Sequence, residues 1–166
     1  MNNVLNFAVP PNSTVSARAK GKKILIVDDE PLVRRFIEQA LRASGYEDLV
    51  FSGNGSNVPT LALKEQPQLI IMDVMMPGGN GIRALRALKE SPATAGIPVI
   101  LTSGFNFPTL GECSQNRPDA VLAKPFVASQ LLAKVEGIFE KPAAPPIVPE
   151  VRRYANGGSR TQPVPV

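Results

Sequence analysis

The sequence predicts an α/β fold: a doubly wound, five-stranded parallel sheet covered by helices on both faces. Five short runs rich in Val, Ile and Leu alternate with segments of helical apolar spacing. Each run is continuous, as is typical of strands that are buried on both faces. Strands alternating with helices build a parallel sheet through right-handed crossovers. The predicted strands lie within residues 22–29, 49–53, 68–73, 97–103 and 120–126.

Helical periodicity fills the intervals between the predicted strands. Apolar residues recur with a helical period after the first, third and fifth runs, which predicts amphipathic helices there. The helices expected after the second and fourth runs are less regular, because Pro59 and Gly111 interrupt them. The apolar positions of the regular helices are Val33, Ile37, Ala40 and Leu41, then Ile82, Leu85 and Leu88, then Val127, Leu131, Val135, Ile138 and Phe139.

Basic residues occupy other faces of these predicted helices. Arg34 and Arg35 are expected on the solvated face of the first helix. Arg83, Arg86 and Lys89 form a stripe on the third helix that is more often solvated than a docking site, although docking of a partner is an alternative.

Charge divides the chain into a central domain and two basic tails. Residues 22–140 carry 12 Lys or Arg and 13 Asp or Glu, whereas residues 1–21 add a net charge of +2 and residues 141–166 add +3. The last segment is rich in Pro and Gly and has no apolar period. We therefore expect a flexible N-terminal extension at 1–21, one domain at 22–140 and a Pro-rich disordered tail at 141–166.

The composition restricts the chemistry. Cys113 is the only cysteine and histidine is absent, which excludes an internal disulfide and a Cys/His zinc site, so any metal must bind through oxygen. No run reaches the roughly 18 apolar residues of a membrane span, and the first residues lack a basic leader followed by an apolar stretch. We expect no membrane span and a cytoplasmic location.

Polar residues follow four of the five predicted strands, where each strand ends. The carboxyl ends of parallel strands meet at one edge, where such folds bind ligands. Taken singly, each residue has an ordinary role, such as a helix start, a turn or a solvated lysine. Taken together, crowded carboxylates repel one another, and a bound Mg²⁺ would remove that conflict. The residues are Asp28, Asp29 and Glu30, then Asp73, then Thr102 and Ser103, then Lys124.

Four motifs occur at these positions: ILIVDDE, IIMDVMMPGGNG, ILTSG and LAKPF. In this order and spacing they resemble the receiver domain of two-component response regulators, in particular the stand-alone receivers related to the chemotaxis receiver. The resemblance covers residues 22–140. It implies a flavodoxin-like receiver fold with the strand order 2-1-3-4-5.

The resemblance also implies roles for individual residues. Asp73 would accept a phosphoryl group from a sensor histidine kinase or a phosphotransfer protein. Lys124 and Thr102 would contact that phosphoryl group, and the Lys124–Pro125 peptide would be cis. The cofactor would be Mg²⁺. Its implied protein ligands are Asp28, Asp29, Asp73 and the backbone carbonyl of Met75.

The chain departs from the receiver pattern in two respects. Many receivers carry Tyr or Phe three residues before the lysine, where this chain has Val121. Either the loop after Thr102 moves without that aromatic partner, with Phe105 or Phe107 as a candidate to take its place, or switching is weak. Met75 and Gly104 lack the acidic or amide groups that could orient an attacking water. Slow self-dephosphorylation is the resulting hypothesis.

These observations favour a single-domain response regulator rather than an enzyme. It would signal by phosphorylation-dependent binding to a downstream target protein, and homodimerisation is left open. Residues 141–166 are too few and too Pro-rich for a DNA-binding domain. One alternative is a pseudo-receiver that binds partners without phosphorylation. The other is a Mg²⁺-dependent phosphatase of the haloacid dehalogenase type, which needs a second Asp where this chain has Met75.

Overall fold

The computed structural model of the protein describes residues 21–77, 79–104 and 116–140. The predicted N-terminal extension, apart from Gly21, and the predicted Pro-rich tail therefore lie outside the described residues. So do Cys113, Phe105 and Phe107, and most of the segment in which a helix was expected after the fourth strand.

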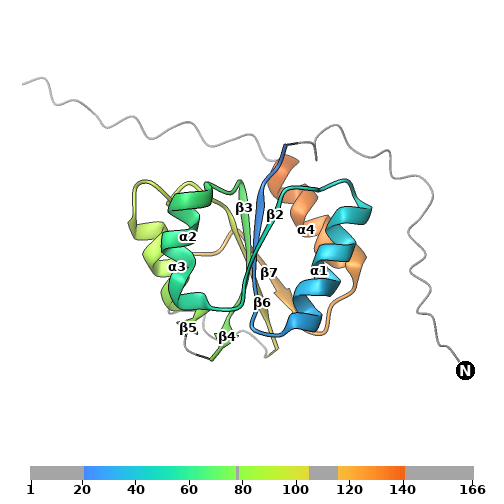
Figure 1. Ribbon diagram of the computed structural model, residues 1–166, viewed down its shortest axis with the longest axis horizontal. Coiled ribbons are helices and arrows are strands. Elements are labelled where there is room, and N and C mark those ends of the chain that lie inside the picture. Colours follow the sequence, from blue (N-terminus) through green and yellow to red (C-terminus); the bar gives the residue numbers. More distant parts are fainter. Residues whose placement is uncertain (1–20, 78, 105–115, 141–166) are drawn as a thin grey trace, which may run out of the picture.

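A five-stranded parallel sheet forms the centre of the molecule (Figure 1). Its spatial order is β2-β1-β3-β6-β7, which is the order 2-1-3-4-5 when only the strands of this sheet are counted along the chain. The predicted order is thereby confirmed. The strands are β1 (Ile24–Val27), β2 (Leu49–Ser52), β3 (Leu69–Asp73), β6 (Val99–Ser103) and β7 (Ala120–Ala123).

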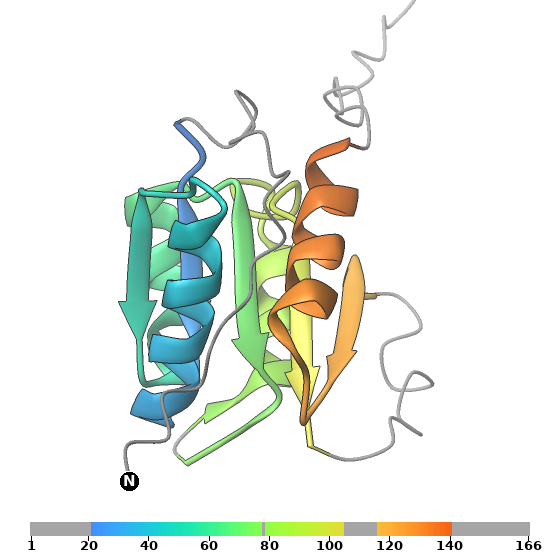
Figure 2. The ribbon, with the colours of Figure 1, turned by 90° about the vertical axis from the view of Figure 1, so that its right-hand side faces the viewer.

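Helices cover both faces of the sheet. α1 and α4 lie side by side on one face, and α2 and α3 lie on the other (Figures 1 and 2). A short 3-10 helix, η1 (Gly55–Asn57), leads into α2. The α-helices are α1 (Pro31–Ala43), α2 (Val58–Glu65), α3 (Gly81–Glu90) and α4 (Ala128–Glu140). Among the described residues, none of these helices has the length and apolar character needed to cross a membrane.

The core is split by the sheet because successive side chains of a strand point to opposite faces. In β1, Ile24 and Ile26 pack in the cluster under α1 and α4, whereas Leu25 and Val27 pack in the cluster under α2 and α3. All four residues of β1 are buried. This two-sided burial, which β3 and β6 share, explains why the inner strands are continuous apolar runs. The expectation of burial on both faces is wrong for β2 and β7, because they lie at the edges of the sheet and are partly exposed.

Two sequence expectations about helices are corrected. Pro59 does not interrupt its helix but lies in the first turn of α2, where a missing N–H breaks no helical hydrogen bond. Val127 does not belong to the buried face of the last helix: it precedes α4 and is 58% exposed. Its carbonyl accepts from the N–H groups of Gln130 and Leu131, so Val127 forms the entry to α4.

A small hairpin that the sequence did not predict follows β3. β4 (Met75–Met76) pairs antiparallel with β5 (Gly79–Asn80). A Cβ at Gly79 would lie 2.7 Å from the Ser56 nitrogen and 2.9 Å from the Cα of Gly55. The hairpin therefore packs backbone to backbone against η1, and only a residue without a side chain fits at position 79.

Candidate functional site

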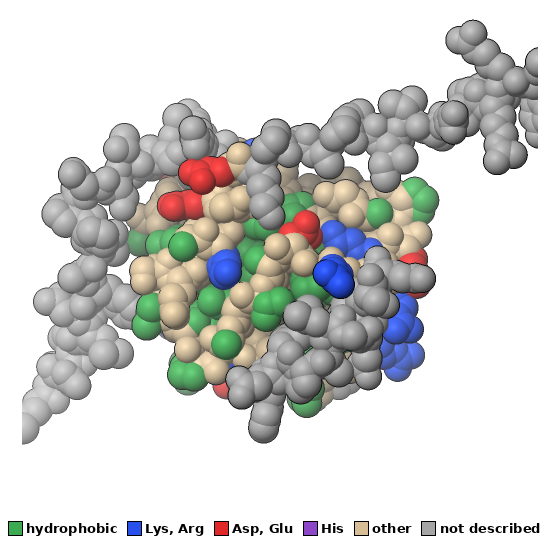
Figure 3. Space-filling view, turned by 180° about the vertical axis from the view of Figure 1, so that it is seen from behind, with side chains coloured by type: hydrophobic (Ala, Val, Ile, Leu, Met, Phe, Trp, Pro, Cys, Tyr) green, Lys and Arg blue, Asp and Glu red, His purple; other side chains and the backbone are tan. Residues whose placement is uncertain are grey.

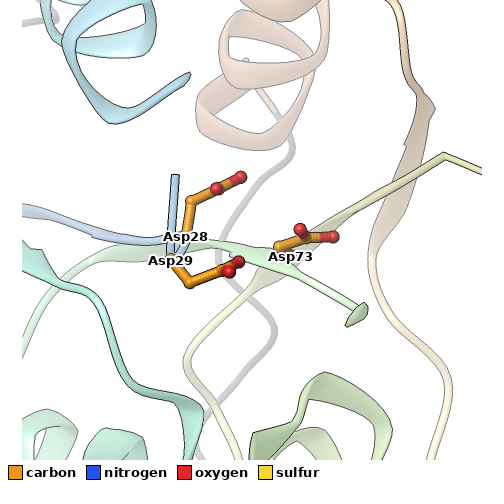
Figure 4. A group of neighbouring side chains, drawn as sticks. All are labelled: Asp28, Asp29 and Asp73. Atoms are coloured by element: carbon orange, nitrogen blue, oxygen red, sulfur yellow. The ribbon is translucent and has the colours of Figure 1, made fainter. Parts of the chain in front are cut away.

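The polar residues at the strand ends gather at one edge of the sheet. Asp28 and Asp29 follow β1, and Asp73 is the last residue of the neighbouring strand β3. Figure 4 shows the side chains of Asp28 and Asp29 at the end of β1, beside that of Asp73. Thr102 on β6 is the register partner of Asp73. Four of the predicted site residues are thus brought together.

Lys124, directly after β7, joins the two buried carboxylates. Its Nζ lies 2.8 Å from Asp28 Oδ2 and 2.8 Å from Asp73 Oδ2. Glu30 Oε1 lies 3.9 Å from the same nitrogen, but Glu30 is exposed and contributes little. The Lys124–Pro125 peptide is cis, as expected. The ammonium group therefore offsets negative charge that is held away from water.

Burial and charge act against each other at this site. Burial raises the pKa of Asp28, and the hydrogen bonds from Lys124 and the Glu30 N–H offset only part of that effect. Burial alone would lower the pKa of Lys124, but its hydrogen bonds to Asp28 and Asp73 raise that pKa above its usual value. The acidic pair is thus crowded and desolvated, and it favours a bound cation.

The backbone fixes both carboxylates. The N–H of Glu30 donates to Asp28 Oδ1 at 2.9 Å, and the N–H of Met75 donates to Asp73 Oδ1 at 3.2 Å. Gly81 packs directly behind Asp73, because a Cβ at Gly81 would lie only 2.2 Å from the Asp73 carbonyl oxygen. The position of the nucleophile candidate therefore depends on a glycine at the start of α3.

Thr102 differs from the other site residues. Its side chain is buried, yet its Oγ1 has no hydrogen-bond partner among the residues that the structure describes. Leaving a buried hydroxyl unpaired costs about 1 to 3 kcal/mol. A hydroxyl in this state, in register with Asp73, can donate to a group attached to that carboxylate.

The donor set suits a hard divalent cation. One carboxylate oxygen each from Asp28, Asp29 and Asp73 can serve as a ligand, and these atoms all lie within 4.8 Å of one another. Carboxylate oxygens, completed by water, are the ligands that Mg²⁺ prefers. The residues present therefore fit Mg²⁺. Met75, whose backbone carbonyl was expected as a further ligand, lies two residues after Asp73, at the start of β4.

The structure also assigns contacts to two basic residues that were expected to be solvated. Arg34 is half-buried, and its Nη1 donates to the backbone carbonyl of Asp28. Lys89 is 16% exposed and bonds to the Ile97 carbonyl at 3.0 Å and to Asp119 Oδ2 at 3.1 Å. The solvated interpretation is wrong for both, because these long side chains reach backbone and acidic groups outside their own helices.

The rest of the predicted stripe on α3 does face solvent. Arg83 and Arg86 are exposed. Basic side chains gather on the side of the molecule where α2 and α3 lie, seen from behind in Figure 3. Lys89, the third member of the stripe, instead joins α3 to the segments that precede β6 and β7, through Ile97 and Asp119.

The chain belongs to the response regulator receiver domain family, whose model matches residues 24–136. The class defined by the fold and the acidic edge is thus a receiver domain of two-component systems. Phosphorylation and Mg²⁺ binding are general features of this family.

Curated relatives show the same assignment. The chain is 34% identical over 122 residues to the phosphate regulon transcriptional regulatory protein PhoB of Pseudomonas aeruginosa, covering 73% of this chain and 53% of that protein. It is 30% identical over 118 residues to a Rhizobium etli protein named Probable chemotaxis protein CheY, covering 70% of this chain and 92% of that protein. The chain thus spans about half the length of PhoB and most of the length of the second relative.

Solved structures agree with the fold. The receiver domain of a Pseudomonas aeruginosa sensor histidine kinase, solved with a magnesium ion coordinated in its active-site cleft, matches with a TM-score of 0.66 and 26% identity. That match covers 73% of this chain and 99% of the other. The chemotaxis response regulator CheY4 of Vibrio cholerae matches in fold with a TM-score of 0.65 at 24% identity, covering 70% of this chain and 98% of the other.

Proposed function

We propose that this domain is a phosphoacceptor signalling module that receives a phosphoryl group on Asp73 from a sensor histidine kinase or a phosphotransfer protein. The observation that carries the proposal is the setting of Asp73: a buried carboxylate fixed by Met75 and Gly81 and bonded to Lys124. It is in register with Thr102, whose buried hydroxyl has no hydrogen-bond partner within the described part of the chain.

The transfer step follows from this arrangement. An oxygen of Asp73 attacks phosphorus, an acyl phosphate O–P bond forms, and the P–N bond of the donor phosphohistidine breaks. The electron pair of that bond stays on the donor imidazole nitrogen, which takes up a proton. Mg²⁺, when held by Asp28, Asp29, Asp73 and the Met75 carbonyl, supplies positive charge for the phosphoryl oxygens.

Lys124 and Thr102 are the residues of this chain that respond to the new group. Lys124 exchanges one of its carboxylate partners for a phosphoryl oxygen, which is a charge-assisted hydrogen bond. The Thr102 hydroxyl donates to another phosphoryl oxygen and thereby gains a partner. The change at the ends of β6 and β7 is the signal that a downstream target protein binds.

The signal passes without the usual aromatic residue on β7. Val121 is half-buried and pairs with Leu101 of β6. A β-branched valine is restricted at χ1 and has no ring that could turn inward. We infer that the phosphorylated domain signals chiefly through the ends of β6 and β7, as a binding module and not as an enzyme that turns over a substrate.

The test is incubation with Mg²⁺ and acetyl phosphate, read by intact mass. We expect one added phosphoryl group on the wild-type chain and none on Asp73→Asn, with both variants folded by circular dichroism. Turnover of many acetyl phosphate molecules without a stable adduct would instead favour a phosphatase. An unchanged mass in the wild type would favour a pseudo-receiver.

The same assay tests the proposed extent of the module. Residues 22–140 contain every residue of the site, so we propose that residues 141–166 are dispensable for phosphorylation. Removal of 141–166 is expected to leave both the melting temperature and the extent of labelling unchanged. A large loss of either would mean that this segment contacts the domain.

A further inference from the structure

We propose that Arg34 is a positioning residue for the metal site: its guanidinium holds the peptide between Asp28 and Asp29 and so sets the direction of the Asp29 carboxylate. The proposal rests on the Mg²⁺-dependent function above. It concerns a residue of α1 that itself touches neither the carboxylates nor a phosphoryl group.

The first step is the contact itself. Arg34 lies in the first turn of α1 and reaches back so that Nη1 donates to the carbonyl oxygen of Asp28, the residue after β1. The side chain is half-buried. A hydrogen bond from a charged group is stronger than one from a neutral group, so this contact is strong enough to hold a peptide orientation.

Arg34 completes the bonding of Asp28. The Asp28 N–H donates to the Ser52 carbonyl at 3.2 Å, Oδ1 accepts from the Glu30 N–H at 2.9 Å, and Oδ2 accepts from Lys124 at 2.8 Å. The carbonyl is the remaining polar atom, and Arg34 is its donor. Every polar atom of this buried residue is therefore bonded. Loss of Arg34 would remove the hydrogen bond to the Asp28 carbonyl and release the peptide between Asp28 and Asp29.

Gly53 makes room for the contact. A Cβ at Gly53 would lie 3.3 Å from Arg34 Nη1 and 4.0 Å from the Asp28 carbonyl oxygen. The guanidinium thus lies against the backbone just after β2. A branched side chain at position 53 would push the guanidinium off the carbonyl while leaving its positive charge in the protein.

Asp29 is the residue that this peptide controls. Among the described residues, its carboxylate makes no hydrogen bond or ion pair, although it is one of the three candidate metal ligands. Because a peptide unit is planar, a fixed Asp28 carbonyl also fixes where the Asp29 N–Cα bond points. Asp29 therefore depends on its backbone, and on Arg34, to face Asp73.

Charge and positioning make opposite predictions. If Arg34 acted only as a nearby positive charge, its removal would reduce repulsion and tighten cation binding. If Arg34 holds the Asp28–Asp29 peptide, its removal weakens binding, because partners that orient metal ligands typically affect metal affinity tenfold or more. The sign of the change separates the two roles.

The experiment measures Mg²⁺ affinity by isothermal titration calorimetry on the full chain, without any phosphoryl donor. We expect Arg34→Ala and Gly53→Val each to weaken Mg²⁺ binding roughly tenfold. The matched control is Arg35→Ala, which removes the same charge from the adjacent, exposed position and should change affinity less than twofold. Backbone amide shifts of Asp29 in a ¹⁵N correlation spectrum should move in the first two variants and not in the control.

The outcomes decide the proposal. It is overturned if Gly53→Val and Arg34→Ala bind Mg²⁺ as well as Arg35→Ala does, or more tightly than wild type. Should Arg34→Ala fail to fold, Gly53→Val decides alone, because it keeps the arginine. A wild type that binds Mg²⁺ but takes no phosphoryl group would defeat the proposed function and leave this inference standing.

Discussion

The end of β1 and the end of β6 flank the same carboxylate, Asp73, but their polar atoms differ in how completely they are bonded. Asp28, after β1, has a partner for its N–H, its carbonyl and both carboxylate oxygens. Thr102, on β6, is also buried, yet its hydroxyl has no partner among the described residues. Within the described part of the chain, the polar atoms of Asp28 on the β1 side all have hydrogen-bond partners, whereas the Thr102 hydroxyl on the β6 side has none.

The difference indicates which strand end would hold a cation in a fixed geometry and which strand end would respond to phosphorylation. Bonds to every polar atom hold Asp28 in one geometry, as a cation site requires, since metal affinity depends on oriented ligands. An unpaired buried hydroxyl raises the free energy of the unphosphorylated state and can be relieved by a new acceptor. We therefore infer that the β1 side would hold the cation in a fixed geometry and that the β6 side would respond to phosphorylation.

The largest effect is expected from Lys124→Met. This substitution removes the ammonium group that bonds to both Asp28 and Asp73. Two buried carboxylates then face each other, so we expect the free energy of unfolding to fall by about 2 kcal/mol in the absence of Mg²⁺. Added Mg²⁺ should restore part of that loss, measured by urea denaturation with and without the ion.

Lys89→Met is the matched control for that prediction. Lys89 is 16% exposed and Lys124 is 18% exposed, and each bonds to an acidic side chain. The Lys89 variant should also lose stability, but Mg²⁺ should not restore it, because Asp119 is not part of the three-carboxylate cluster. If Mg²⁺ restored the stability of both variants equally, the assignment of the cation site to the end of β1 would be contradicted.

A smaller effect, on rate, concerns the lifetime of the phosphorylated state. Met75 is 67% exposed and a Cβ at Gly104 would meet nothing within 4 Å, so Met75→Asn with Gly104→Glu adds polar groups at the site without disturbing the core. Side chains that orient the attacking water should speed hydrolysis roughly tenfold to a hundredfold. The measurement is the decay of labelled protein after the donor is removed. If the wild type and the double variant decay at the same rate, the water-positioning argument is contradicted.

The sequence was sufficient for the sheet, and for the gathering of the candidate site residues at one edge, because both depend on local patterns. Continuous apolar runs located the five strands, and polar residues at the ends of four of these runs located the polar edge. The β4–β5 hairpin was missed because its strands have two residues each, which is too short for any periodicity. Pro59 was misjudged because periodicity alone does not distinguish a proline within a helix from one in its first turn.

The contacts of long side chains were not predictable from spacing. Helical periodicity places the Cα of Arg34 and of Lys89, but a flexible stem of several carbons then decides where the charge lies. Arg34 reaches the Asp28 carbonyl only because Gly53, far along the chain, leaves space beside it. Such a contact depends on three segments at once, and none of them indicates it alone.

The smallest expected effect belongs to Thr102→Val, and it tests the difference between the two sides most directly. The control is Thr94→Val, because Thr94 is equally buried and its hydroxyl does donate, to the Leu88 carbonyl at 2.8 Å. The measurement is the melting temperature of both variants and wild type, before and after phosphorylation with Mg²⁺ and acetyl phosphate.

Before phosphorylation, Thr102→Val should be as stable as wild type or more stable, by up to about 1 kcal/mol, because no hydrogen bond of its hydroxyl to the described residues is lost. After phosphorylation the sign should reverse, since only the wild-type hydroxyl can donate to the phosphoryl group. Thr94→Val should be destabilised equally in both states. A Thr102→Val variant that is already destabilised before phosphorylation, or one whose sign does not reverse, would contradict the division between a fixed cation side and a responding side.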